Sequence, residues 1–238
     1  SKGDPMRITN SFSRDSLMLA LALAANLGLV PIAHSRDAGP ARPLTLASAD
    51  FDIDGYPELV TGYATPEGGL VEVRRGNPEA FAPRDPAAQW LRVPASPDFL
   101  AAGDFDRDRN PDLVVASRGG RELYLLAGDG RGGFSTPRVI PLSGRLTALT
   151  SGELDVPDDR PDLVVGVAGD QGASILVYEG AERGILDQPE TIPLEASASA
   201  LALGFLDESP FRSLPIAAAG GVTIVHGRNP RDRDHAVD

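Results

Sequence analysis

The sequence predicts an all-β fold, a β-propeller built from four-stranded blades of about 50 residues, with four blades present and the last one incomplete. Two observations predict it. An acidic loop followed by a β-branched run recurs along the chain, and a glycine ends each repeat, at Gly76, Gly128, Gly180 and Gly227, spaced by 52, 52 and 47 residues. A single small sheet cannot bury both of its faces, so such units must stack on their neighbours. The predicted blades span about residues 44–95, 96–144, 145–196 and 197–238.

Residues 1–35 are predicted to be an export signal, and residues 1–5 of them a cloning remnant or an over-long gene start. Two arginines precede an apolar run at 17–32, and small residues mark a cleavage point after Ser35. The run is shorter than the ~20 residues that span a bilayer, although an uncleaved anchor and a buried core helix stay open as alternatives. We therefore expect a secreted or periplasmic protein, with no stable membrane insertion after cleavage and a membrane anchor if the signal is kept. Residues 36–43 are predicted to be a linker because they hold two prolines and a glycine.

Each predicted blade has the same succession of strands. The first strand leads into the acidic loop, at 44–49, 99–103, 146–152 and 198–204. The second leaves the loop, at 59–63, 113–117, 163–167 and 216–218. The third follows a glycine-bearing turn, at 70–73, 123–126, 175–178 and 222–225. A fourth strand is predicted in the first three blades only, at 89–93, 137–142 and 190–194.

The first acidic loop predicts a calcium site. Asp50, Asp52, Asp54 and Glu58 occupy its positions 1, 3, 5 and 9, and the Tyr56 carbonyl lies between the last two. Two carboxylates about 4 Å apart repel by roughly 4 kcal/mol at an effective dielectric near 20, so such a cluster needs a cation. Calcium accepts six to eight hard oxygen ligands from carboxylates and backbone carbonyls. Position 6 is a glycine, where the turn is expected to require φ > 0.

The later loops repeat this pattern with decreasing fidelity. The second offers Asp104, Asp106, Asp108, Asp112 and the Asn110 carbonyl, with Arg109 in place of the glycine. The third is one residue longer and offers Glu153, Asp155, Asp158 and Asp162, with Asp158 and Asp159 both open as the inward acid. The fourth has Phe205 and Leu214 at the first and last ligand positions and is predicted to bind no metal.

Two other kinds of acidic loop are an EF-hand and a solvated turn without a metal. An EF-hand needs a glutamate at position 12 and flanking helices, but that position holds Thr61 or Val115 inside a predicted strand. A solvated acidic turn without a metal is the second alternative, and it fits the third loop better than the first.

Composition excludes several functions. The net charge of −12 without a basic patch argues against nucleic acid as a partner. There is no cysteine, so no disulfide is available. Three scattered histidines do not form a zinc site, and neither a nucleophile elbow nor a P-loop motif occurs. The glycine-rich segment 128–133 joins two predicted strands, which favours a hairpin turn over a phosphate loop. We therefore predict that the protein is not an enzyme.

The loop Asp-Phe-Asp-x-Asp-Gly-x-Pro-Glu/Asp-Leu-Val and the later Gly-Asp-Gly-Arg-Gly-Gly-Phe at 128–134 resemble the FG-GAP/VCBS repeats of integrin α-subunit-type β-propellers. The resemblance covers about residues 44–227 and is most specific in the first two blades. It implies calcium in the hairpin between the first and second strands of a blade, held by the acids at positions 1, 3, 5 and 9 of the first two loops. Such propellers usually have seven blades, so a fragment of a longer product is favoured over assembly with a second copy through open blade edges.

The sequence thus predicts an exported calcium-binding propeller that acts as a scaffold for a protein or carbohydrate ligand, with calcium as a structural ion. The alternative is the propeller portion, catalytic or not, of an extracellular enzyme acting on polysaccharide or another polymer. A calcium buffer or sensor is a third reading, which the strand-rich surroundings of the loops disfavour.

Overall fold

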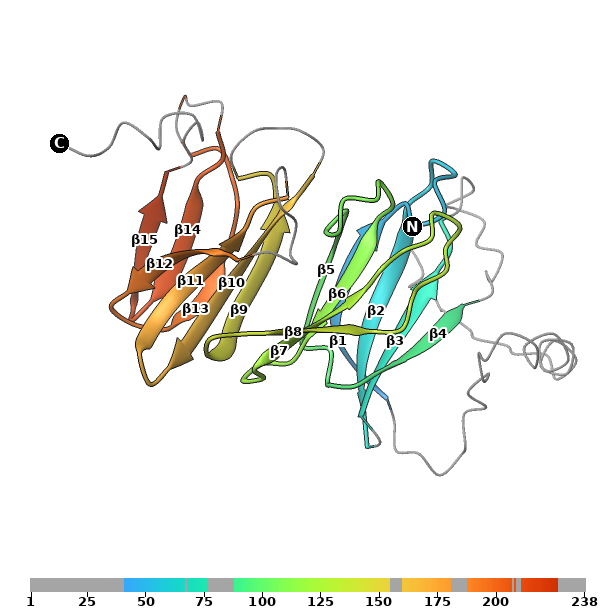
Figure 1. Cartoon of the computed structure of the whole chain (residues 1–238), viewed down its shortest axis with the longest axis horizontal. Coiled ribbons are helices and arrows are strands. Elements are labelled where there is room, and N and C mark those ends of the chain that lie inside the picture. The colour runs from blue at the N-terminus through green and yellow to red at the C-terminus, as the bar shows by residue number, and fades with distance from the viewer. Residues whose placement is uncertain are drawn as a thin grey trace, which may run out of the picture. The chain divides into compact units, whose positions relative to one another are not determined.

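Each predicted blade forms one antiparallel sheet in a computed structural model of the chain (Figure 1). The structure describes residues 41–66, 68–76, 88–154, 160–180, 188–206, 208 and 211–226. These residues hold strands and no helix, and so no helix among them is long and apolar enough to cross a membrane. The predicted signal at 1–35 lies outside the described residues.

Strands follow one another across each sheet in sequence order. Blade 1 comprises β1 (Arg42–Ala49), β2 (Glu58–Thr65), β3 (Gly68–Arg74) and β4 (Gln89–Val93). Blade 2 comprises β5 (Phe99–Gly103), β6 (Asp112–Ala116), β7 (Glu122–Leu126) and β8 (Arg138–Pro141). Blade 3 comprises β9 (Arg145–Gly152), β10 (Asp162–Gly169), β11 (Gly172–Tyr178) and β12 (Glu190–Leu194). Blade 4 comprises β13 (Ala198–Leu201), β14 (Leu214–Ala218) and β15 (Gly221–Val225).

The strand boundaries differ from the predicted ones at both ends of the repeat array. β1 begins at Arg42 and so includes the last two residues of the predicted linker. Pro43 fits there because the register with β2 shifts between Pro43 and Thr45, and a proline is tolerated at such a bulge. In blade 4 the first strand ends at Leu201 and the second begins at Leu214, two residues before the predicted start.

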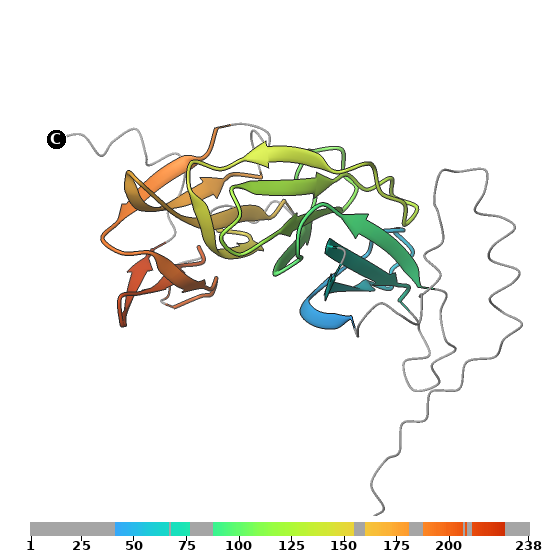
Figure 2. The ribbon, with the colours of Figure 1, turned by 90° about the horizontal axis from the view of Figure 1, so that it is seen from below.

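The blades stack in sequence order, because the first strands of neighbouring blades contact one another: β1 with β5, β5 with β9, and β9 with β13. Figure 2 shows this succession as a colour change from one sheet to the next. Strands that line a common axis in this way are characteristic of a propeller.

Apolar residues on both faces of the middle strands fill the spaces between blades. In β6 all five residues are buried. Leu113 and Val115 pack against blade 1 with Phe51 and Val60. Val114 and Ala116 pack on the other side, in the cluster shared with blade 3. A third cluster, around Leu214 and Ile216, joins blade 3 to blade 4. The run Leu-Val-Val is therefore continuous rather than alternating because the sheet is covered on both faces.

Truncation of one interior side chain tests this stacking. Leu163 of β10 is fully buried in the core between blades 2 and 3. We expect Leu163→Ala to lower the free energy of unfolding by about 2–5 kcal/mol because it removes apolar contacts and leaves a cavity. Urea denaturation of the full chain measures this loss.

The matched control is Leu46→Ala, since Leu46 is 64% exposed on β1. It should change the stability by less than ~0.5 kcal/mol. Equal losses for the two variants would contradict blade stacking through this core.

Candidate metal centres

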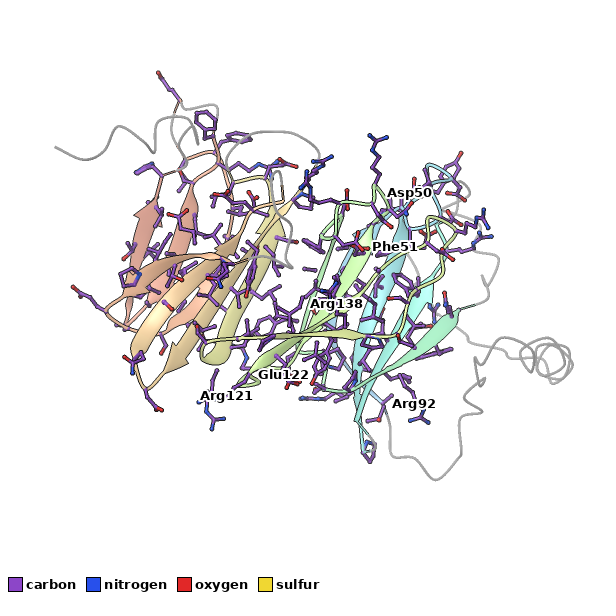
Figure 3. All side chains as sticks on the ribbon, viewed as in Figure 1. Asp50, Phe51, Arg92, Arg121, Glu122 and Arg138 are labelled. Carbon is purple, nitrogen blue, oxygen red and sulfur yellow. The ribbon has the colours of Figure 1, made fainter. Side chains whose placement is uncertain are left out.

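The first acidic loop closes the hairpin between β1 and β2. Figure 3 shows Asp50 and Phe51 at one end of the sheets, whereas Arg121 and Glu122 lie at the other end. The Asp50 carboxylate accepts hydrogen bonds from the backbone N–H groups of Asp54 (3.0 Å) and Gly55 (2.8 Å), which fix the turn. Gly55 has φ of 89°, as predicted for position 6, because only glycine adopts this conformation without steric cost.

Three of the predicted ligands converge in this loop. One carboxylate oxygen each from Asp50, Asp52 and Glu58 lie within 4.8 Å of one another. The Asp52 side chain is only 4% exposed, and its Oδ1 is buried without a hydrogen-bond partner. Its Oδ2 forms an ion pair with the guanidinium of Arg75. A buried carboxylate oxygen without a partner is costly, so this donor set fits a hard cation.

The other two predicted ligands of this loop lie differently. Asp54 is exposed, and its Oδ1 accepts the N–H of Tyr56 (2.9 Å). The Tyr56 carbonyl lies against Gly76, so close that a Cβ on that glycine would be 2.1 Å from the oxygen.

The second loop, between β5 and β6, brings together Asp104, Asp106 and Asp108, with carboxylate oxygens within 4.8 Å of one another. Asp104 accepts hydrogen bonds from the N–H groups of Arg107 (2.7 Å) and Arg109 (3.1 Å). Both arginines have positive φ, 73° and 74°, which costs a residue other than glycine roughly 1–2 kcal/mol. Burial, with the neighbouring Asp108 charge, raises the pKa of Asp106 above its ordinary value, as expected for crowded carboxylates without a cation. Two further ligands were predicted here, the Asn110 carbonyl and Asp112. The side-chain amide of Asn110 donates to Asp108 Oδ2 (2.9 Å).

The last acid of each loop has a second role that the sequence analysis missed. Glu58, Asp112 and Asp162 are all buried, with at most 2% of the residue exposed. One carboxylate oxygen accepts the N–H of the residue at position 2 of the same loop, at 2.7, 2.8 and 2.8 Å from Phe51, Phe105 and Leu154. The other accepts the N–H of the closing glycine, at 3.3, 2.9 and 2.9 Å from Gly76, Gly128 and Gly180. The acid therefore ties the start of its loop to the end of the third strand in three blades.

Burial has an electrostatic consequence at Asp112, which is fully buried. Desolvation raises the pKa of its carboxyl to about 6, although the N–H groups of Gly128 and Phe105 oppose the shift. Such a carboxylate tolerates burial only because backbone donors satisfy both of its oxygens.

The closing glycines are required by close approach rather than by φ. A Cβ on Gly128 would lie 2.1 Å from the Pro111 carbonyl oxygen, and one on Gly180 would lie 2.6 Å from that of Arg160. A recurring acid followed after 16 to 18 residues by a glycine is the sequence signal of this contact.

In the third loop, Asp155 and Asp158 lie outside the described residues. Glu153 is half-buried, and Asp162 makes the buried contacts given above.

The strand register corrects the alignment of the fourth loop. Leu214 pairs with Val225 as Leu113 pairs with Leu126, and both leucines are fully buried. The residue at the place of the last acid is therefore Ser213, not Leu214. Counting from Phe205 as position 1 gives the same result, since position 9 is Ser213 and Leu214 is position 10. Ser213 is 1% exposed, and its Oγ lies 3.4 Å from His226 Nδ1. Phe205, at position 1, is 62% exposed, so no carboxylate stands at either end of this loop.

The glycine-rich segment 128–134 is a hairpin turn, as predicted, since Gly128 and Phe134 form a β-bridge. It packs on the first loop of the neighbouring blade. Gly132 donates its N–H to the Phe51 carbonyl (3.1 Å), and the rings of Phe51 and Phe134 meet edge to face at 5.0 Å. The first loop is thus part of the interface between blades 1 and 2.

Removal of the last acid from the third blade tests its structural role. We expect Asp162→Ala to lower the free energy of unfolding by about 2–5 kcal/mol with excess chelator present, because the N–H groups of Leu154 and Gly180 lose their acceptor. Thermal denaturation measures it, and Asp170→Ala, at an exposed acid, is the control. A loss that appears only when calcium is present would contradict a direct structural role.

A methyl group on a closing glycine tests the close approach. We expect Gly128→Ala to cost about 1–3 kcal/mol, since the new Cβ collides with the Pro111 carbonyl. Gly204→Ala is the matched control, because Gly204 has no heavy atom within 4 Å of an added Cβ and no positive φ. Chemical denaturation of both variants measures the difference, and a neutral Gly128→Ala would refute the steric explanation.

Comparison with known proteins supports the repeat and the fold. Residues 104–156, from the first acid of the second loop into the third loop, match the FG-GAP-like repeat. No curated protein sequence matches the chain. Similar solved structures include BBS1N in complex with ARL6DN, soaked with lead, which is 18% identical with a TM-score of 0.51, over 79% of this chain and 55% of that chain.

A second structure of BBS1N in complex with ARL6DN, soaked with mercury, is 19% identical with a TM-score of 0.52, over 80% of this chain and 59% of that chain. The chain thus spans less than two thirds of these relatives, and identity this low shows the fold alone. The chain contains an FG-GAP-like repeat and has the propeller fold predicted from its sequence.

Proposed function

We propose that the chain is a calcium-binding β-propeller repeat protein that acts as an interaction scaffold, with calcium as a structural ion in its hairpin loops. The observation that carries the proposal is the buried Asp52 Oδ1, which has no hydrogen-bond partner and belongs to the converging Asp50, Asp52 and Glu58 carboxylates.

The first loop is the better site. Its three acids offer only hard oxygen donors, and their converging charges repel one another unless a cation is present. When bound, calcium would supply positive charge that offsets this repulsion. The residues themselves hold the turn: Asp50 through the N–H groups of Asp54 and Gly55, and Glu58 through those of Phe51 and Gly76.

The second loop is proposed as a weaker site. Asp108 is exposed, and Arg109 takes the positive φ that glycine takes in the first loop. The remaining predicted ligands stay part of the proposal: Asp54, Tyr56, Asn110, Asp112, Glu153, Asp155, Asp158 and Asp162.

The scaffold role is proposed from the propeller fold and from the partner present in the similar structures. BBS1N is in complex with a protein, ARL6DN, in both similar structures, which supports a protein ligand for this chain. The second proposed partner is another copy of this chain, which would pair through open blade edges. Among the described residues no strand pairs with the outer edge of β15, where Val222 is 67% exposed.

Export to the periplasm or the cell exterior is also part of the proposal, and it rests on the sequence of residues 1–35. It agrees with calcium as the ion, since extracellular modules bind calcium at millimolar levels. Processing of the full chain expressed in a secreting host, read by N-terminal sequencing, tests it. A chain that is recovered unprocessed in the cytoplasm would refute export.

Calcium dependence of stability tests the metal proposal. We expect the thermal midpoint of the full chain to rise from excess chelator to millimolar free calcium, since ligand bound only by the folded state stabilises by about 2.7 kcal/mol at a hundredfold excess over Kd. Asp52→Asn should remove the part of the response due to the first loop. The control Asp170→Asn, at an exposed acid, should leave the response unchanged. A cooperative unfolding transition whose midpoint does not change with free calcium would contradict the proposal.

A further inference from the structure

We propose that Arg75 is an internal competitor for the cation at the first loop, so that it sets the calcium affinity of this loop. The inference rests on the proposed calcium site. It concerns a residue outside the acidic loop, 23 positions from the acid that it contacts.

Arg75 reaches the site from the surface. Its side chain is 66% exposed, whereas that of its ion-pair partner Asp52 is 4% exposed. Arg75 directly follows β3 and directly precedes Gly76, whose N–H donates to Glu58 Oε1 at 3.3 Å. Two consecutive residues of one strand end therefore contact two of the three converging carboxylates.

The guanidinium satisfies this cluster only in part. It pairs with Asp52 Oδ2, whereas Asp52 Oδ1 stays buried without a partner. Arginine carries a single positive charge that is not lost at any physiological pH, on a planar group too large to sit among three carboxylates. A compact divalent ion matches both the charge and the donor set better.

The two cations exclude each other. A divalent ion beside Asp52 would repel the guanidinium that now contacts the same carboxylate. Most of the Arg75 side chain lies in solvent, so its guanidinium can turn outward into water. Calcium binding at the first loop must therefore overcome the Arg75–Asp52 ion pair, which lowers the apparent affinity.

The other blades provide an internal comparison. The residue before the closing glycine is Ala127 in blade 2 and Glu179 in blade 3. Among the first three blades, only blade 1 places a cation at this position, and blade 4 has His226 there. Arg75→Ala gives blade 1 the residue of blade 2.

Calorimetric titration of the full chain with calcium tests the inference. Parent and variant both carry Asp106→Asn, which weakens calcium binding by the second loop, so that the measured binding reports mainly on the first loop. We expect Arg75→Ala to bind calcium about two- to fivefold more tightly than its parent, the upper part of the range for loss of one partly exposed ion pair. Arg75→Lys keeps the charge and should stay within about twofold of the parent.

Stability provides the second readout. Without calcium, Arg75→Ala should unfold at a lower temperature than its parent, because repulsion among Asp50, Asp52 and Glu58 loses its counter-charge. With saturating calcium, Arg75→Ala should unfold at the same temperature as its parent or at a higher one. A merely structural arginine would lower the midpoint equally in both conditions.

The outcomes separate the two proposals. Equal calcium affinity of the parent and Arg75→Ala, with calcium bound by both, overturns the role of Arg75 and leaves the calcium site standing. Absence of calcium binding by both chains overturns the site and the competitor together.

Discussion

A buried carboxylate that bonds two distant backbone N–H groups is the interaction on which each of the first three blades depends. It stands at the start of the second strand and reaches both the beginning of its own loop and the end of the third strand. Without it two buried donors would lack an acceptor, and each such loss costs about 1–3 kcal/mol. The geometry leaves no room for a side chain on the closing glycine, which explains why both residues recur together.

The hydrogen bonds of this buried carboxylate also help to position the blades against one another. With loop and third strand fixed to each other, the middle strand presents alternate apolar residues to the two neighbouring blades. The glycine-rich turn of blade 2 then settles on the first loop of blade 1 through Phe51 and Gly132. Phe51 donates its N–H to Glu58 and also packs on the turn of blade 2. A substitution of the acids in the first loop should therefore affect the packing between blades 1 and 2.

The repeat, the strand order and the turn at Gly55 could be predicted because each has a signal in a short stretch of sequence. These signals are a glycine spacing, a β-branched run and a required φ. Other features could not. Glu58, Asp112 and Asp162 each bond a closing glycine 16 to 18 residues away, and a pattern of acids is equally typical of metal ligands. Ser213 could have been found from the sequence, since it is position 9 counted from Phe205, and the strand register confirms its place. Arg75 was missed because its partner is 23 residues away in a different segment.

The first and last acids of the loops contribute differently to folding, although Glu58 belongs both to the fold and to the proposed calcium site. Asp50 and Asp104, the first acids of the first two loops, are half-buried and accept hydrogen bonds from backbone N–H groups of their own turns. The last acid is committed to the backbone whether or not a cation is present. Blade 4 shows the same division in a loop without carboxylates at these places: a buried serine occupies the inner position, and an exposed phenylalanine the outer one. The hairpin of blade 4 therefore forms without a carboxylate at the first or the last position of its loop. It follows that calcium would adjust the stability of a blade that the buried inner residue already defines.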